Sequence, residues 1–346
     1  MSQSSSLRPA ASEDFFMLKK NVGGVRLEPG TMADELLHPA AKSTLSGDSL
    51  TETQYFSVSI PEENIHGLVY CWHRPNLKIV TGGAWIWQGV KRHHLACELF
   101  DFRSFMSDAA LANDLSSYRL ENGLGVEVVE AAKRFHVTYA DEARGNAIDL
   151  HYTAATPLVK FGDGAHFEQG MRVQGELSLR GQRYRVDGLN VRDRTWASER
   201  SEISQPIPPV SWMTGAFNEN FYFGIVAFDH PDLQPDWAGL FDFPAEKALK
   251  SGWIYRDGQL LDVVSCRKLT THDPVYLFPT EVQVEMVDNQ GRTYRIKGTA
   301  KAASNWSAWL NCDVVISLFR WECDGLVGHG DLQEARWTDY LQARLR

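Results

Sequence analysis

The sequence offers little that would tie it to a structural metal, a disulfide framework or a membrane. It has five cysteines, none of them in a Cys-x-x-Cys pair, which argues against disulfides and cysteine-based zinc sites. Unpaired thiols are typical of a reducing compartment, so we expect a cytoplasmic protein. No apolar run approaches the roughly 20 residues needed to span a bilayer, and the Ser-rich start shows no secretory signal.

Basic residues and phosphate-binding loops are also scarce. Lys and Arg number 35 against 44 Asp and Glu, a formal net charge of −9, which argues against a nucleic-acid partner. Neither Gly-x-Gly-x-x-Gly nor a P-loop occurs, and no Gly-x-Ser-x-Gly elbow is present. His93 and His94 are adjacent, and adjacent strand residues point to opposite faces, so they are not expected to share an ion. We therefore expect no metal and no cofactor, although His94 could reach a substrate.

Aromatic residues, in contrast, are abundant, with 11 Trp, 11 Tyr and 17 Phe among 346 residues. Large aromatic side chains favour strands, and alternation of apolar and polar residues recurs in many short segments separated by Gly-containing turns. This pattern predicts an all-β sandwich or barrel. Helical patterns are few and short. The clearest predicted strands are 55–60, 66–72, 82–88, 125–130, 134–139, 147–153, 171–180, 182–187, 221–228, 259–267, 280–287 and 293–301, and the predicted helices are 108–115, 245–251 and 332–345.

Two parts of the sequence are similar to each other, and we call them the echo segments. Residues 64–77 resemble 220–233, and 83–87 resemble 239–243 at the same offset. Either the chain contains two related β units, or two aromatic strand-turn-strand segments simply look alike. We divide the chain into a flexible tail (1–12), an N-terminal lipocalin-like β domain (13–160) and a C-terminal one (161–346).

Three further segments carry a family resemblance. These are His166-Phe-Glu-Gln169 followed by two strands joined at Gly181, then Arg192-Asp-Arg-Thr-Trp196, and late in the chain Gly328-His-Gly-Asp-Leu-Gln-Glu334. They resemble the carotenoid 1,2-hydratase (hydroxyneurosporene synthase)-like family of duplicated lipocalin-like proteins, related to tocopherol cyclase and lipocalin-type Diels–Alderases. The resemblance implies two lipocalin-like antiparallel β-barrels or half-barrels with few short helices.

The sequence departs from this family at two positions. Arg194 stands where the hydratases usually have His, and Ala197 where they have Gly. Because Arg does not release its proton near neutral pH, a mechanism that depends on that His cannot be carried over. The Asp and the Trp of the motif, here Asp193 and Trp196, can be carried over.

Asp193 is the main candidate for acid catalysis. On a strand, Arg192, Arg194 and Trp196 would share one face, with Asp193 on the other. A carboxyl group in an aromatic cavity has a raised pKa and could protonate an alkene or alcohol, and aromatic faces would stabilise the resulting cation. Alternatively, the Arg-Asp-Arg run is a salt-bridged clamp between the barrels. The aromatic candidates for substrate binding are Trp196, Trp85, Trp87 and Trp212.

Two other carboxyl groups could serve as second acids. Glu168 could position water opposite Asp193, or lie on a solvated hairpin edge. Glu334 could face the same cavity, or provide a charge at the start of the last helix. Arg192 and Arg194 would be structural or would orient an anionic group of the substrate. Aromatic side chains two residues apart on one strand face, such as Trp85 and Trp87, could equally fill a core. We call these pairs the aromatic stripes.

Together these features predict a cofactor-independent hydratase or dehydratase, isomerase or cyclase. Its substrate would be a hydrophobic terpenoid or polycyclic small molecule, and its chemistry acid-driven and carbocation-like. The alternatives are a non-catalytic carrier of a hydrophobic metabolite and a pericyclase that acts by shape. A homodimer is left open.

Overall fold

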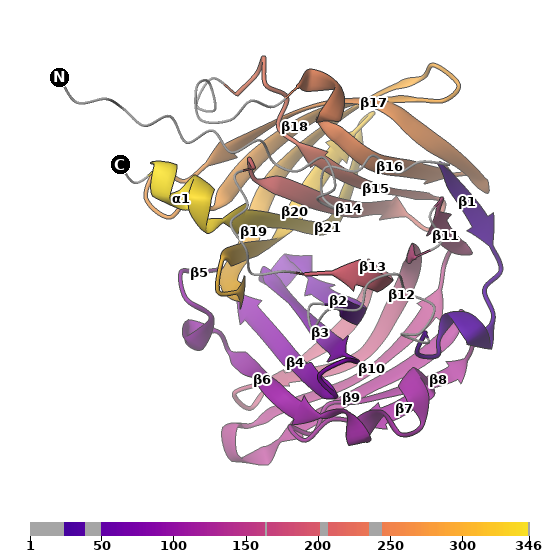
Figure 1. Ribbon diagram of the computed structural model, residues 1–346, viewed down its shortest axis with the longest axis vertical. Coiled ribbons are helices and arrows are strands. Elements are labelled where there is room, and N and C mark those ends of the chain that lie inside the picture. Colours follow the sequence, from indigo (N-terminus) through magenta and orange to yellow (C-terminus); the bar gives the residue numbers. More distant parts are fainter. Residues whose placement is uncertain (1–23, 39–49, 163–164, 201–206, 235–243, 345–346) are drawn as a thin grey trace.

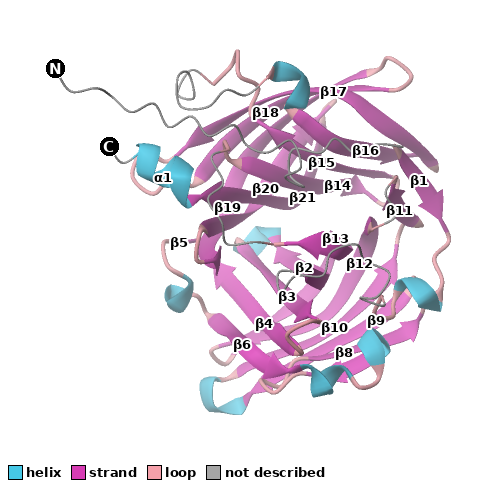
Figure 2. Cartoon of the chain, in the orientation of Figure 1, coloured by secondary structure: helices cyan, strands magenta, loops and turns pink. Residues whose placement is uncertain are grey.

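The computed structural model describes residues 24–38, 50–162, 165–200, 207–234 and 244–344. Strands dominate these residues, as Figure 2 shows, and they form two large sheets that lie one above the other. The expected all-β class with two barrel-like units is confirmed. The tail expected at 1–12 and the echo segment 239–243 lie outside the described residues.

The first sheet is an open half-barrel of 12 strands, coloured indigo to magenta in Figure 1. Its main path runs β6-β4-β3-β2-β13-β12-β10-β9-β8-β7, with β11 beside β12 and β1 beside β11. In order along the chain, the strands are β1 (Val25–Glu28), β2 (Leu50–Ile60), β3 (Ile65–Arg74), β4 (Ile79–Gln88), β6 (Leu99–Ser107), β7 (Ser117–Arg119), β8 (Gly125–Glu130), β9 (Arg134–Asp141), β10 (Asn146–Ala154), β11 (Leu158–Phe161), β12 (His166–Leu179) and β13 (Gln182–Glu199).

The second sheet is a closed barrel, because β18 pairs with both β17 and β19. The short strand β5 (Val90–Lys91) from the N-terminal half adds to β19 in parallel. The last strand of the first sheet ends at Glu199, and the next strand, Val210–Asn218, belongs to the barrel. The expected domain boundary at 160/161 stays a prediction. The barrel strands are β14 (Val210–Asn218), β15 (Phe221–Phe228), β16 (Leu249–Arg256), β17 (Gln259–His272), β18 (Pro279–Asp288), β19 (Thr293–Trp309), β20 (Cys312–Cys323) and β21 (Leu326–Trp337).

Burial patterns along the strands show where the two sheets pack together. In β9 and β10, buried residues alternate with accessible ones, as expected for strands with one face in a core and one in water. In β2 and β15, every residue is buried. These two strands are therefore covered on both faces, one face packing inside its own sheet and the other against the neighbouring sheet.

The predicted helices are largely replaced by other structure. Residues 108–111 and 245–247 form single 3₁₀ turns, and the predicted helix 332–345 shrinks to α1 (Thr338–Arg344). The earlier part of that segment is β21, which pairs with β14 and β20. Closure of the barrel requires this strand, so long-range pairing overrides the local helical pattern. No helix in the described ranges has both the length and the apolar character needed to cross a membrane.

Trp85 and Trp87 lie in the layer between the sheets. Both are fully buried and pack with Leu318 of the barrel strand β20. Their ring centroids are 4.7 Å apart, and the Trp85 indole donates a hydrogen bond to Cys97 Sγ at 3.2 Å. The aromatic stripes are expected either to bind substrate or to fill a core, and the geometry of Trp85 and Trp87 supports a packed core.

Replacing Trp85 with Ala should therefore lower the free energy of unfolding by about 3–5 kcal/mol, because it leaves a large cavity between the sheets. Urea unfolding followed by circular dichroism measures the change. Leu310→Ala serves as a control, since Leu310 is 90% exposed and its truncation should cost no more than about 0.5 kcal/mol. Equal costs for the two variants would contradict the assignment of Trp85 to the inter-sheet core.

Candidate active site

A single row of side chains crosses the first sheet on the face that meets the barrel. Strand register places Glu168 opposite Asp193 and Asp193 opposite Tyr55. The same row continues through Tyr70 and ends beyond Gly83, at Phe102. Directly paired residues of an antiparallel sheet point to the same side, so an acidic segment and an aromatic segment lie next to each other on one face. We call this set the inter-sheet row.

Two hydrogen bonds link the inter-sheet row to the barrel. The Tyr55 hydroxyl donates to Asp331 Oδ2 of β21 at 2.5 Å, and the Trp253 indole N–H of β16 donates to Glu168 Oε2 at 2.5 Å. Gly224 of β15 makes room for the second contact, because a Cβ there would lie 2.3 Å from the same carboxylate oxygen. The two linked residues flank Asp193 in the row.

Asp193 occupies the centre of the row and is half-buried. Burial raises the pKa of its carboxyl group to about 6, and this effect outweighs the favourable charge of His166. The carboxylates of Glu168 and Asp331 raise the pKa further. No described residue donates a hydrogen bond to the Asp193 carboxyl group. About half of Asp193 is thus protonated at pH 6 and about a tenth at pH 7, and this fraction is able to give up its proton.

Glu168 is buried and held by a second partner on its own strand. His166 Nε2 lies 3.4 Å from Glu168 Oε1, and His166 Nδ1 lies 2.8 Å from the Thr195 hydroxyl. The His–Glu pair can accept a proton, or orient a water molecule, beside Asp193. The alternative of a solvated hairpin edge does not fit, because Glu168 is only 3% exposed.

Asp331 completes the acidic group from the barrel side. Burial raises its pKa, opposed by His66 and by hydrogen bonds from Tyr55 and Ser57. His66 Nε2 is 3.3 Å from Asp331 Oδ1, and burial lowers the pKa of this histidine. The pKa of Tyr55 lies well above its usual range because of burial and the nearby Asp331. The pKa shifts of Asp193, Asp331, Tyr55 and His66 thus all favour the neutral forms of these side chains.

Arg192 and Arg194 point to the opposite side of β13, into the interior of the half-barrel. The Arg192 guanidinium makes a two-pronged ion pair with Glu35 at 2.7 and 3.0 Å. Arg194 pairs with Glu52 of β2 and donates to the Asp34 carbonyl at 2.8 Å. Both arginines are fully buried. The geometry therefore supports the structural role predicted for them, but the clamp joins parts of the first sheet and does not bridge the two sheets.

Trp196 shares the arginine side of β13. Its indole stacks on the His38 ring, with centroids 3.9 Å apart and planes 3° from parallel, and it contacts Phe167 at 6.1 Å. This position separates Trp196 from the inter-sheet row. A role for Trp196 in stabilising a cation next to Asp193 is not favoured by this arrangement.

Partly exposed aromatic rings form a wall at the other end of the row. Tyr70 and Phe102 stack across Gly83 at 6.4 Å, and Phe102 meets Trp306 of β19 at 5.1 Å. Gly83 has φ +146°, and a Cβ there would lie 1.8 Å from the Asp101 carbonyl oxygen. His94 packs on Phe100 at 4.4 Å at the edge of this wall. The buried pair of Trp85 and Trp87 lies behind it, since Trp85 contacts Phe100, Phe102 and Trp306.

Glu334 and Trp212 lie apart from the row. Glu334 is buried and accepts a hydrogen bond from His272 Nε2 at 3.0 Å. Burial works to lower the pKa of His272, but the charge and hydrogen bond of Glu334 raise it overall. His272, but not Glu334, lines a pocket of ≈ 390 Å³, together with residues that include Thr270 and Tyr340. Trp212 packs in a separate apolar cluster of β14 and α1.

The sequence patterns do not single out Tyr55, Asp331 or His66. Asp331 lies inside the Gly328–Glu334 segment that carries part of the family resemblance, but Glu334 is the candidate that this segment suggests. Residues three apart on a strand face opposite sides, so only one of the two carboxyl groups can meet the first sheet. Leu332 is apolar and faces the barrel core. Because neighbouring residues of a strand point to opposite faces, Asp331 must face out of the barrel, and this is the signal that could have identified it.

The chain matches one protein family and several solved structures. The family model described as Domain of unknown function (DUF7064) matches residues 31–339. Comparison with curated proteins gives no significant match. Kievitone hydratase from Nectria haematococca shares the fold with TM-score 0.52 and 11% identity, over 92% of this chain and 98% of that chain. CghA has TM-score 0.53 and 9% identity, over 91% and 98%.

Arg192→Met should destabilise the protein by about 3–5 kcal/mol, because Glu35 would remain buried without its partner. The double variant Glu35→Leu/Arg192→Met should recover most of this loss, since neither charge remains. Urea unfolding measures both. Arg185→Met on the same strand is the control: its side chain is 84% exposed, and the cost should stay within about 0.5 kcal/mol. A double variant no more stable than Arg192→Met would argue against an isolated ion pair.

Asp193→Asn should change the pH dependence of stability. The folded pKa of about 6 exceeds the ordinary value of 3.8, so the stabilisation from the bound proton is complete below pH 3.8 and lost as pH rises through 6. From pH 4 to pH 8 the wild type should therefore lose up to roughly 3 kcal/mol relative to Asp193→Asn, at about 1.4 kcal/mol per pKa unit. Urea unfolding at several pH values measures this difference, and parallel stability curves would show that Asp193 has an ordinary pKa.

Proposed function

The chain belongs to the DUF7064 family, and from the geometry of the inter-sheet row we propose that it is an enzyme of the hydro-lyase or cyclase type. It would act on a hydrophobic small molecule by acid catalysis, with Asp193 as the proton donor. The single observation that carries this proposal is the protonatable Asp193 carboxyl group, with a pKa of about 6, in the same row as an aromatic wall. The name of the similarly folded kievitone hydratase adds support.

The acidic segment supplies the groups for the chemistry. Asp193 would transfer its proton to a carbon of an alkene, leaving a carbocation on the neighbouring carbon. In hydration, a water molecule would attack this carbon and lose a proton to the His166–Glu168 pair. In cyclisation, a second double bond of the substrate would attack instead, and the His166–Glu168 pair would take a proton from the carbon next to the new cation. Dehydration is the reverse of hydration and uses the same groups.

The aromatic wall supplies the binding surface. Tyr70, Phe102 and Trp306 are only partly buried, so they remain available to an apolar substrate. Their ring faces attract positive charge, which favours a cationic intermediate formed next to them. The hydrophobic substrate, terpenoid or polycyclic, is an inference from this wall and from the resemblance of residues 166–196 to the carotenoid hydratases.

A non-catalytic carrier is the second candidate function. The pocket beside His272 offers ≈ 390 Å³, enough for a small ligand. Its lining includes Gln234, Thr271 and Asp273, however, and these polar groups suit a polar ligand better than an apolar metabolite. A pericyclase that acts by shape needs no proton donor, so it would not account for the raised pKa of Asp193.

A mixture of apolar metabolites tests for activity when the substrate is unidentified. The protein is incubated with an apolar extract of its source organism, and with kievitone, in water labelled with heavy oxygen. Mass spectrometry then detects products that gain or lose water, or isomers of unchanged mass. We expect such a product with the wild type, and a reduction of at least about a hundredfold with Asp193→Asn, the size of effect typical of general acid catalysis.

Asp187→Asn is the matched control. Asp187 lies earlier on the same strand, where its side chain is exposed and paired with Arg172 at 2.6 Å, so activity should be retained. With the wild type, kcat/KM should fall as pH rises above about 6, because the acid form of Asp193 is depleted. Unchanged turnover by Asp193→Asn would refute the acid role. A rate independent of pH would favour the pericyclase, and tight binding without any product would favour the carrier.

A further inference from the structure

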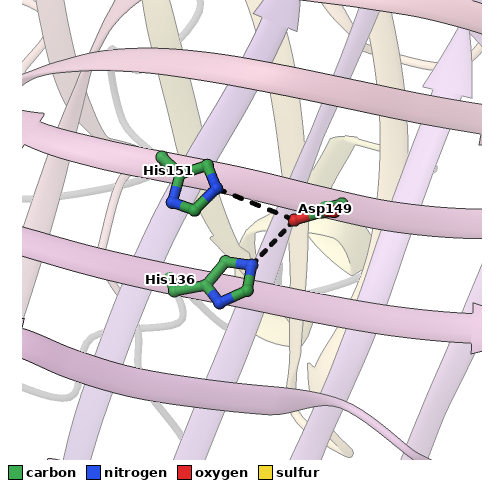
Figure 3. Close-up of side chains that lie close together, drawn as sticks. All are labelled: His136, Asp149 and His151. Atoms are coloured by element: carbon green, nitrogen blue, oxygen red, sulfur yellow. Dashed lines mark hydrogen bonds and ion pairs between the residues drawn. The ribbon is translucent and has the colours of Figure 1, made fainter.

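Two histidines and one aspartate converge on the outer face of the half-barrel, away from the inter-sheet row. Figure 3 shows His136 on β9 with Asp149 and His151 on β10. His136 and His151 are directly paired across the two strands, and their rings stack with centroids 4.4 Å apart and planes 7° from parallel. Asp149 precedes His151 by two residues and so shares its face.

We propose that His136, Asp149 and His151 bind a divalent transition-metal ion of the zinc(II) type. One ligand atom from each residue lies within 4.8 Å of the others. Asp149 Oδ1 is 2.7 Å from His136 Nε2 and 4.0 Å from His151 Nε2. Two imidazoles with a carboxylate form one of the commonest ligand sets for zinc, and a fourth position is left for water or another carboxylate.

The required adjustment is small. Zinc–ligand bonds of about 2.0–2.2 Å place tetrahedral ligands about 3.3 Å from one another. The His136–Asp149 separation must therefore widen slightly, and the His151–Asp149 separation must shorten by less than an ångström. All three side chains sit on regular strands, and Asp149 and His151 are well exposed. Rotation of side chains thus suffices, while the strands hold the two histidines in register.

The surroundings favour a cation. Strand register places Glu127 of β8 opposite His136, and Glu176 of β12 opposite Asp149. Both are exposed, and either can reach toward the ion as a further ligand or as a compensating charge. The basic residues near these rows are already paired. Arg185, opposite Glu176 in the Asp149 row, is 3.8 Å from Asp187. In the row beyond His151, Arg134 pairs with Glu130 at 3.1 Å and Arg172 with Asp187 at 2.6 Å.

This inference differs from the expectation that the chain holds no metal. That expectation rests on the adjacent pair His93 and His94, whereas His136 and His151 are brought together only by the pairing of β9 with β10. A bound ion would join these two strands near the open end of the half-barrel, on the β7 side. It would therefore stabilise the first sheet, independently of the chemistry proposed at Asp193.

The test is metal titration of the full-length protein after treatment with a chelator. Isothermal titration calorimetry with Zn²⁺ should show one site, and Cu²⁺ should bind more tightly than Ni²⁺, following the usual order for nitrogen ligands. Mg²⁺ should give no heat, because it prefers oxygen-only octahedral sites. Saturating Zn²⁺ should also raise the thermal unfolding midpoint, since the ion binds only the folded arrangement.

Variants locate the ion. His151→Ala should weaken Zn²⁺ binding by at least about tenfold, the smallest effect typical of disturbing a metal site, and the double variant His136→Ala/His151→Ala should abolish it. His93→Ala is the control and should bind as the wild type does. Circular dichroism confirms that the exposed substitutions leave the fold intact. Absence of Zn²⁺ binding at micromolar concentrations, or affinity unchanged in the double variant, would overturn the proposal.

Discussion

The structure depends on the burial of one face of the half-barrel against the closed barrel. β2 and β15 are covered on both sides along their whole lengths, so polar groups between the sheets are largely shielded from water. Such groups must either form hydrogen bonds across the interface or remain uncharged. Tyr55 and Glu168 do the first, through Asp331 and Trp253. Asp193, half-buried and with no hydrogen-bond donor among the described residues, responds instead with a raised pKa of about 6.

The two faces of β13 separate structural charges from the reactive one. Arg192 and Arg194 lie on one face, and their charges are matched by Glu35 and Glu52. Asp193 lies on the other face. If an arginine shared the face of Asp193, it would hold the carboxyl group ionised and remove its ability to donate a proton. The alternation of a strand thus places two ion-paired arginines and a carboxyl group with a raised pKa within three consecutive residues.

Much of this arrangement follows from the sequence, because it is local. Period two along residues 192–196 predicts that Asp193 and its neighbouring arginines face opposite sides. The abundance of aromatic residues and the recurring alternation predict the all-β class, and the family resemblance implies two barrel-like units. What the sequence does not reveal is long-range pairing. The contact of Tyr55 with Asp331 joins residues from opposite ends of the chain, and the pairing of β13 with β2 depends on how the half-barrel curls. For the same reason, helical periodicity after residue 332 misleads, since barrel closure decides the structure there.

The most direct test is the protonation state of Asp193 itself. Infrared difference spectra between wild type and Asp193→Asn, recorded as a function of pH, isolate the carbonyl band of this one protonated carboxyl group. The account predicts that the band persists above the ordinary pKa of 3.8 and disappears with a midpoint near 6. A midpoint near 3.8 would contradict it, because almost no Asp193 would then hold its proton at pH 6 or above, and the group could not act as the acid.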